Sequence, residues 1–263
     1  MSMFKRSAIH TGLAALFSLS ALGISSTAAA IPVGWSCSGN CGEMGANGVV
    51  TASPEGGSYV YVSTHEAPEQ TGLGLGNETN GTVLRSNVFS AAANDSLAYY
   101  FNFVTSDGAG FADYAWSRLF TATHDLVALL FTARTTPNGN SVPGFGMPAI
   151  EATITPATVT IQAGTSWSPL GGSSGSCYDT GCGHTGWVQS TYDIADAGNY
   201  YLEFGVVNWA DTQFATGMAI DGILVGGVPI DPTPNPVPEP GSLALLGLGL
   251  LGVGALRRRR QAR

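Results

Sequence analysis

Short apolar segments separated by polar turns run through the middle of the chain, between about residues 59 and 225. They are rich in Val, Ile, Phe, Tyr and Thr, and most are bounded by Gly, Asn, Asp or Pro. None shows a sustained helical period. The segments are residues 59–63, 83–89, 97–105, 114–120, 126–133, 151–155, 159–162, 187–194, 200–207 and 218–225. So many short strands in one domain predict an all-β fold, a two-sheet jelly-roll-like β-sandwich over residues 31–227.

The N-terminal end has the pattern of an export signal. Lys5 and Arg6 precede an apolar stretch at residues 12–24, and Ala28-Ala29-Ala30 gives the small-residue pattern that signal peptidase accepts. We therefore predict a signal helix over residues 1–30 that signal peptidase removes. A buried helix or a retained membrane anchor is the alternative.

The C-terminal end has three consecutive parts. Residues 228–237 form a proline-rich linker, and residues 242–256 are an uncharged run of Leu, Gly, Ala and Val. Four arginines follow, Arg257-Arg258-Arg259-Arg260. A run of this length is short for a transmembrane helix, which needs about 20 residues, but arginine stems can extend to the interface. The pattern predicts a transmembrane helix at 242–256 in the inner membrane, with the arginines on the cytoplasmic side.

Pro238, Glu239 and Pro240, followed by that apolar run and arginine cluster, resemble the PEP-CTERM sorting signal, here residues 238–263. The resemblance implies that an exosortase, a membrane-embedded cysteine protease, recognises the motif and processes the tail. It implies an inner-membrane-anchored precursor that then moves to the cell surface or extracellular matrix of an exopolysaccharide- and biofilm-forming bacterium. A plain membrane anchor is the alternative. The central domain resembles one that recurs among PEP-CTERM proteins, but that resemblance supplies no activity.

Charge separates the central domain from the two ends. Arg85, Arg118 and Arg134 are its only Lys or Arg residues, against sixteen Asp and Glu, which gives a net charge near −13. Such a domain repels phosphates, so nucleic acid is excluded as a partner. An acidic surface suits either divalent cations or solubility outside the cell.

Four aspartates are candidate calcium ligands. Asp107 and Asp113 flank a glycine-rich turn after a predicted strand, and Asp211 and Asp221 lie in the closing segments, where Asn208 is a further polar residue. Hard cations need several oxygen ligands, and such turns supply them. The spacing does not match an EF-hand loop, and the alternative is that these residues cap turns.

The four cysteines form two local pairs. An even count in an exported chain favours disulfides, and the spacing favours Cys37–Cys41 and Cys177–Cys182. The alternative is a zinc site made from these cysteines, with or without His184.

No catalytic motif is present in the central domain: there is no nucleophile elbow, zinc-protease helix motif, P-loop or dinucleotide fingerprint. The sequence therefore predicts no enzyme activity. It predicts a structural or adhesive role in a polysaccharide matrix, with a carbohydrate-binding module and an unrecognised hydrolase as alternatives. Sugar-stacking candidates are Trp116, Trp167, Trp187, Trp209 and Tyr178, and we expect Trp167 and Tyr178 to be exposed in the loop at 165–186.

Overall fold

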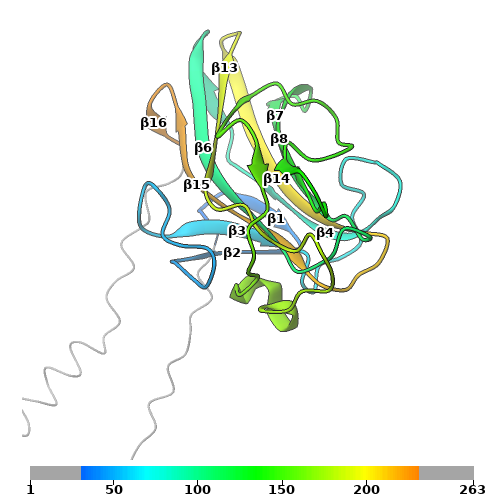
Figure 1. Ribbon diagram of the computed structural model, residues 1–263. Coiled ribbons are helices and arrows are strands. Elements are labelled where there is room, and N and C mark those ends of the chain that lie inside the picture. The colour runs from blue at the N-terminus through cyan, green and yellow to red at the C-terminus, as the bar shows by residue number, and fades with distance from the viewer. Residues whose placement is uncertain (1–30, 231–263) are drawn as a thin grey trace, which may run out of the picture.

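A computed structural model describes residues 31–230 of the protein (Figure 1). The signal peptide, the linker from residue 231, the Pro238-Glu239-Pro240 motif, the apolar run at 242–256 and the arginine cluster lie outside the described residues. Within residues 31–230, no helix has the length and apolar character needed to span a bilayer.

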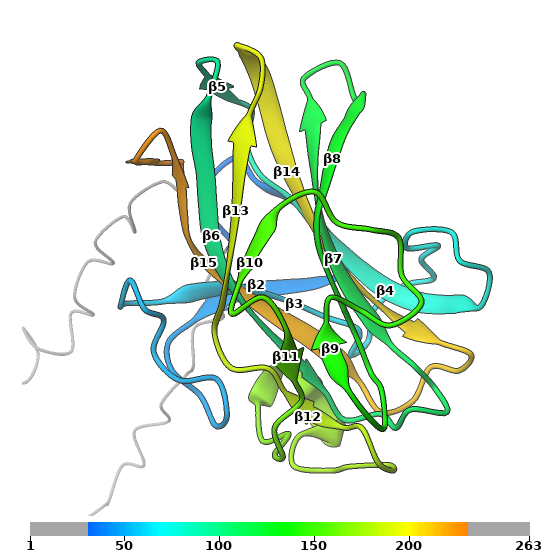
Figure 2. The same ribbon diagram turned by 45° about the horizontal axis from the view of Figure 1, so that its top comes forward.

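Two antiparallel sheets pack face to face, and Figure 2 shows the small pair β9 and β11 in front of their lower part. The first sheet has the order β1 (Ser36–Ser38), β4 (Glu78–Arg85), β14 (Gly198–Trp209), β7 (Tyr114–Thr121), β8 (Leu126–Arg134), and β5 (Phe89–Ala91) also pairs with β14. The second has the order β10 (Thr153–Thr155), β13 (Val188–Ile194), β6 (Asp95–Thr105), β15 (Thr216–Val225), β3 (Tyr59–Ser63), β2 (Asn40–Met44). The short elements are β12 (Gly183–His184) beside β6, β16 (Val228–Pro229) beside β15, β9 (Asn140–Val142) paired with β11 (Val159–Thr160), and the 3-10 helix η1 (Ser168–Ser173). The predicted all-β sandwich is confirmed.

The core forms where the inward side chains of the central strands meet. Alternate residues of β6 point into the sandwich, because successive side chains of a strand face opposite sides. Phe101 stacks on Phe131 of β8 with ring centroids 3.8 Å apart. Tyr99 meets Phe204 of β14 edge to face at 5.3 Å. These contacts join the two sheets, so burial of aromatic surface holds the layers together.

At one end of the sandwich, the inward-facing side chains of five strands are polar, whereas those farther along the same strands are apolar. The residues that close it, which we call the polar layer, are Thr105, Asp113, Thr135, Asn208 and Thr216, all at most 2% exposed. They lie at or beside the ends of β6, β7, β8, β14 and β15. The Thr216 hydroxyl donates to Asp113 Oδ2 and lies 2.8 Å from Thr105 Oγ1. The polar layer is thus a hydrogen-bonded lid on the apolar core.

The sequence pattern missed the short outer strands. β1 and β2 are three and five residues long and contain Ser, Asn, Gly and Cys, so they carry no apolar run. β16 uses Val228 and Pro229, at the start of the predicted linker. It follows a turn in which Gly226 and Gly227 both have positive φ, and Ile230 then packs against the core.

Candidate functional site

Three loops gather at the end of the sandwich closed by the polar layer, and we call this region the loop end. They are residues 106–113 between β6 and β7, residues 210–215 between β14 and β15, and residues 174–182 between η1 and β12. Backbone hydrogen bonds tie them together: Tyr178 N donates to Ser106 O at 3.0 Å, and Ala109 N donates to Thr180 O at 3.0 Å. The Ser106 hydroxyl also donates to the Ala215 carbonyl at 2.7 Å. The loops therefore form one surface although they are far apart in the sequence.

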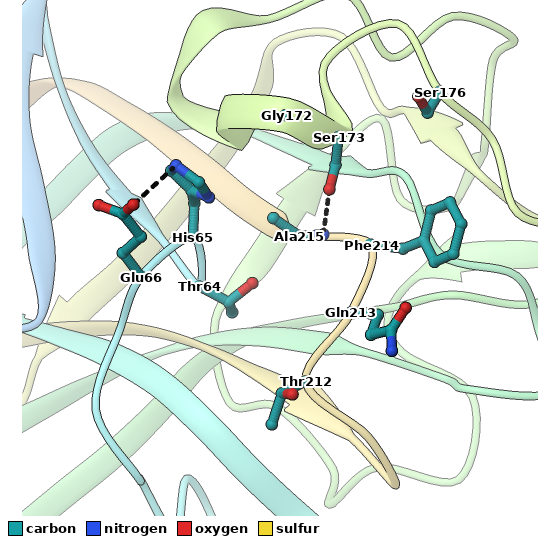
Figure 3. Close-up of a pocket in the computed structure, with 10 residues that line it drawn as sticks. All are labelled: Thr64, His65, Glu66, Gly172, Ser173, Ser176, Thr212, Gln213, Phe214 and Ala215. Carbon is teal, nitrogen blue, oxygen red and sulfur yellow. Dashed lines mark hydrogen bonds and ion pairs between the residues drawn. The ribbon is translucent and has the colours of Figure 1, made fainter.

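An open pocket of about 390 Å³ lies at this loop end (Figure 3). His65 and Glu66 line one side, and Phe214 lies on the opposite side. Ser173 and Gln213 add a hydroxyl and an amide to the lining, and the Ser173 hydroxyl accepts a hydrogen bond from Ala215 N at 3.1 Å. Most of these groups can both donate and accept hydrogen bonds, which suits a ligand rich in hydroxyl groups.

A cluster of three aromatic side chains extends the pocket outward. The Tyr178 side chain is 51% exposed, and its ring lies 5.5 Å from the ring of Phe111 and 5.0 Å from that of Phe214. Phe214 has a backbone φ of 48°, in the left-handed region that a bulky residue rarely adopts. Gln213 N donates to Asp211 Oδ1 at 2.8 Å just before this strained residue. The loop thus holds Phe214 in place at a conformational cost, which is common where a surface is shaped for binding.

The tryptophans expected to stack on sugars are buried or half-buried in the structure. Trp167, expected to be exposed, is fully buried, and its Nε1 donates to the Tyr59 hydroxyl at 2.9 Å. That prediction was wrong because η1 folds the Gly/Ser-rich loop back over β3. Trp116 is also fully buried, while Trp187 and Trp209 are half-buried. Of the five candidates, Tyr178 alone is more than half exposed.

Two buried carboxylates lie directly under the loops. Asp107 is 1% exposed and Asp113 is fully buried. Asp107 Oδ1 accepts from Gly108 N at 2.7 Å, and Asp113 Oδ1 accepts from Trp209 N at 2.8 Å. Burial raises the pKa of Asp107 to about 7, with the charge of Asp211 adding to the rise and the Gly108 bond opposing it. Burial likewise raises the pKa of Asp113 well above its usual range, and the charge of Asp107 adds to this.

The four predicted calcium ligands do not form one group. Asp211 lies close enough to Asp107 and Asp113 for its charge to raise their pKa values. Asp221 lies elsewhere, on β15 beside Tyr100 of β6, and its acidic neighbours are Glu55 and Glu43. In the part of the chain that the structure describes, no three His, Cys, Asp or Glu side chains are grouped as metal ligands. The structure therefore does not bring Asp221 together with the other three aspartates, because Asp221 faces the other side of the sheet from the polar layer.

Comparison with known proteins bears on the C-terminal segment. No curated protein matches the chain. The family model described as the PEP-CTERM protein-sorting motif matches residues 236–260, which include Pro238, Glu239 and Pro240. The chain carries a PEP-CTERM sorting motif. This motif marks an exported protein that is held in the membrane until an exosortase processes it and that then reaches the cell surface.

Two solved structures resemble this chain weakly. They are the K1 and K3 cleaved adhesin domains of Lys-gingipain from Porphyromonas gingivalis W83, each 14% identical to it. The matches cover 74% of this chain and 91% and 92% of the two domains, with TM-scores of 0.37 and 0.35. Similarity at this level does not extend to function.

The four cysteines form the two predicted disulfides, Cys37–Cys41 and Cys177–Cys182. The zinc alternative fails, since a disulfide sulfur is not a thiolate and no described cysteine is free. Cys177–Cys182 encloses Tyr178, so a covalent link restrains the segment that carries the exposed ring.

The sequence did not reveal the pocket residues. His65, Ser173 and Gln213 come from three distant segments and belong to no motif. Phe111 lies between the predicted strands at 97–105 and 114–120, and it was not among the candidate residues. The one available signal was Tyr178 in a loop rich in glycine and serine, which is where the structure places the exposed ring.

Proposed function

We propose that this domain is the adhesive part of a sorted cell-surface protein and that it binds polysaccharide of the extracellular matrix at the loop end. The observation that carries the proposal is the half-exposed Tyr178 ring, which lies with Phe111 and Phe214 beside an open polar pocket. A sugar ring has an apolar face of C–H groups and an edge of hydroxyls. An exposed aromatic ring next to hydroxyl, amide and imidazole groups matches both surfaces.

The destination of the protein supports the same proposal. The PEP-CTERM motif indicates display at the cell surface, where the polymers within reach are extracellular. With three arginines against sixteen acidic residues, the domain repels strongly anionic polymers. We therefore propose neutral or weakly acidic polysaccharide as the ligand, in the matrix of a biofilm-forming bacterium.

The experiment is a binding assay on the full-length protein with a glycan array and with polysaccharide purified from the producing cells. Tyr178→Ala should weaken binding at least about tenfold, since an aromatic contact contributes about 1 kcal/mol or more beyond the area it buries. Phe145→Ala is the matched control, because Phe145 is 73% exposed and is not part of the aromatic cluster. A protein that retains no glycan on the array or in the polysaccharide assay would have a purely structural role.

In this proposal, the pocket binds polysaccharide and does not cleave it. The same incubations test this directly, because a hydrolase would release reducing sugar or shorten the polysaccharide. Such release, lost in a pocket variant such as His65→Ala, would favour the hydrolase alternative over adhesion.

A further inference from the structure

The polar layer, together with Asp107 beside it, contains buried oxygen atoms that have no hydrogen-bond partner among the described residues. Asp107 Oδ2 and Asn208 Oδ1 accept no hydrogen bond from any described residue, and both side chains are 1% exposed. Both atoms can only accept, unless Asp107 is protonated. A buried acceptor without a partner destabilises the folded protein, and a buried charge does so more strongly. Two such atoms at one end of the core therefore need an explanation.

Strand alternation places these oxygens in the same interior space. Val206 of β14 belongs to the main core, so Asn208, two residues later, also points inward. Ala115 of β7 is a core residue, which directs Asp113 inward by the same rule. On β6, Phe103 is a core residue, so Thr105 at the end of the strand also points inward. Asp107 follows two residues later. The two carboxylates and the amide thus lie under the same loops.

No cation forms an ion pair with the carboxylates of this space among residues 31–230, although the charge of Arg134, which bonds the Ala112 carbonyl, acts on Asp113. The ion pairs formed among residues 31–230 involve Glu66 and Glu203, and none includes Asp107 or Asp113. Asp211 adds a third carboxylate nearby, half-buried at the surface of the same loops. Acceptor-only oxygens, several carboxylates without a direct ion pair and near-complete burial together are the features of a hard-cation site.

The geometry points to a calcium ion bound in the polar layer by Asp107 Oδ2 and Asn208 Oδ1, with Asp113 and Asp211 supplying balancing charge. Calcium takes six to eight oxygen ligands, including main-chain carbonyls and water, so it does not require three carboxylates. Its site is formed by the loops at 106–113 and 210–215, which also carry Phe111 and Phe214. Binding would fix these loops whether or not the pocket above them takes a sugar, so this inference is independent of the proposed function.

The test is calorimetric titration of calcium into full-length protein stripped of metal with EDTA, together with melting curves. We expect saturable binding of one ion, a higher melting temperature with calcium, and a much smaller response to magnesium, which demands stricter octahedral geometry. Asp107→Asn keeps the shape and removes the charge, and it should weaken calcium binding at least tenfold. Asn208→Leu tests the amide oxygen and should also weaken it.

Asp221→Asn is the matched control. Asp221 is likewise a partly buried aspartate with an unpartnered oxygen, but it faces the opposite side of β15. This variant should bind calcium as the unaltered protein does. The inference is overturned if the unaltered protein gives no heat and no change in melting temperature, or if Asp107→Asn and Asn208→Leu both bind calcium normally. The titration of the unaltered protein needs no variant, so the inference can be tested even if a variant does not fold.

Discussion

Two regions of this domain bury carboxylates and treat them in opposite ways. On the outer face of the first sheet, Glu203 is 1% exposed and is paired with two arginines. Arg85 of β4 donates to Glu203 Oε2 from Nε at 3.0 Å and from Nη2 at 2.9 Å, and Arg118 of β7 donates to Oε1. Trp116 Nε1 adds a bond at 3.3 Å. At the polar layer, Asp107 and Asp113 are equally buried and receive only backbone and hydroxyl donors.

The difference shows how a chain with few cations uses them. The domain has three arginines, and two of them flank a single glutamate across neighbouring strands. Arg134, the third, lies over the Trp209 ring at 4.5 Å and bonds the Ala112 carbonyl. On the sheet face, the charge of the buried glutamate is therefore balanced by arginines of the same domain. The polar layer depends on a proton or on an ion from outside the chain.

The largest change in stability should come from removing the arginines that balance the charge of Glu203. Arg85→Met combined with Arg118→Met leaves Glu203 buried without a counter-charge, so we expect the free energy of unfolding to fall by about 3–5 kcal/mol. Denaturant titration measures it, with the single variants as controls. A loss below about 1 kcal/mol would mean that the pairs contribute no more than exposed salt bridges do.

The second effect is the dependence of stability on pH at the polar layer without metal. The pKa of Asp107 is about 7 in the folded protein and near 4 when unfolded, so folding favours the protonated form. Its contribution is complete below about pH 4 and is lost as the pH rises through 7; Asp113, also raised, acts in the same direction. In EDTA, we expect the free energy of unfolding to fall by about 2–4 kcal/mol from this source between pH 4 and pH 8.

Denaturant titrations across that pH range measure the loss. Calcium should restore stability at pH 8, because the ion favours the ionised carboxylates. The other buried carboxylates titrate at the same time, so the comparison with Asp107→Asn isolates the contribution of this residue. Identical slopes in the variant and the unaltered protein would remove Asp107 as the cause.

A smaller effect follows from the same substitution at a single pH. At pH 8 in EDTA, Asp107→Asn removes a buried, unpaired charge, so we expect it to stabilise the domain by about 1–2 kcal/mol. Glu203→Gln should do the opposite, since it weakens a pair that is already satisfied. Melting curves of the two variants should therefore move in opposite directions, and movement in the same direction would break the contrast between the two regions.

The smallest effect is expected at the surface of the loop end. Tyr178→Ala should change the free energy of unfolding by less than about 0.5 kcal/mol, because half of the side chain faces solvent and it has no role in the polar layer. Thermal melting measures this alongside the binding assay. A large loss of stability would show that the aromatic cluster holds the loops together.

Much of the fold could be predicted from the sequence. The runs at 97–105, 114–120 and 200–207 have the length and residue types of central strands, and the structure places them in β6, β7 and β14. The disulfide pairing followed from cysteine spacing, because each pair closes a short local loop. Edge strands such as β1 gave no signal, since a strand with one neighbour and no buried face needs no apolar residues.

The candidate site could be predicted only in fragments. Asp107 and Asp113 were recognisable as acids around a glycine-rich turn, and Tyr178 as a ring in a small-residue loop. Asp221 looked equivalent to them in sequence, but strand register decides which side of a sheet a residue faces. Trp167 looked exposed for a similar reason, since nothing local shows that η1 packs it against Tyr59. Long-range contacts of this kind are the part that a sequence pattern does not contain.

Strand β15 runs directly away from the loop end. It begins at Thr216 in the polar layer and ends at Val225, where β16 and Ile230 lead toward the sorting motif. Ten residues of strand extend roughly 30 Å at 3.3 Å each. The pocket and the turn between β15 and β16 therefore lie at opposite ends of β15. A ligand in the pocket therefore makes its contacts at the end of β15 that is remote from the turn leading into the last described residues.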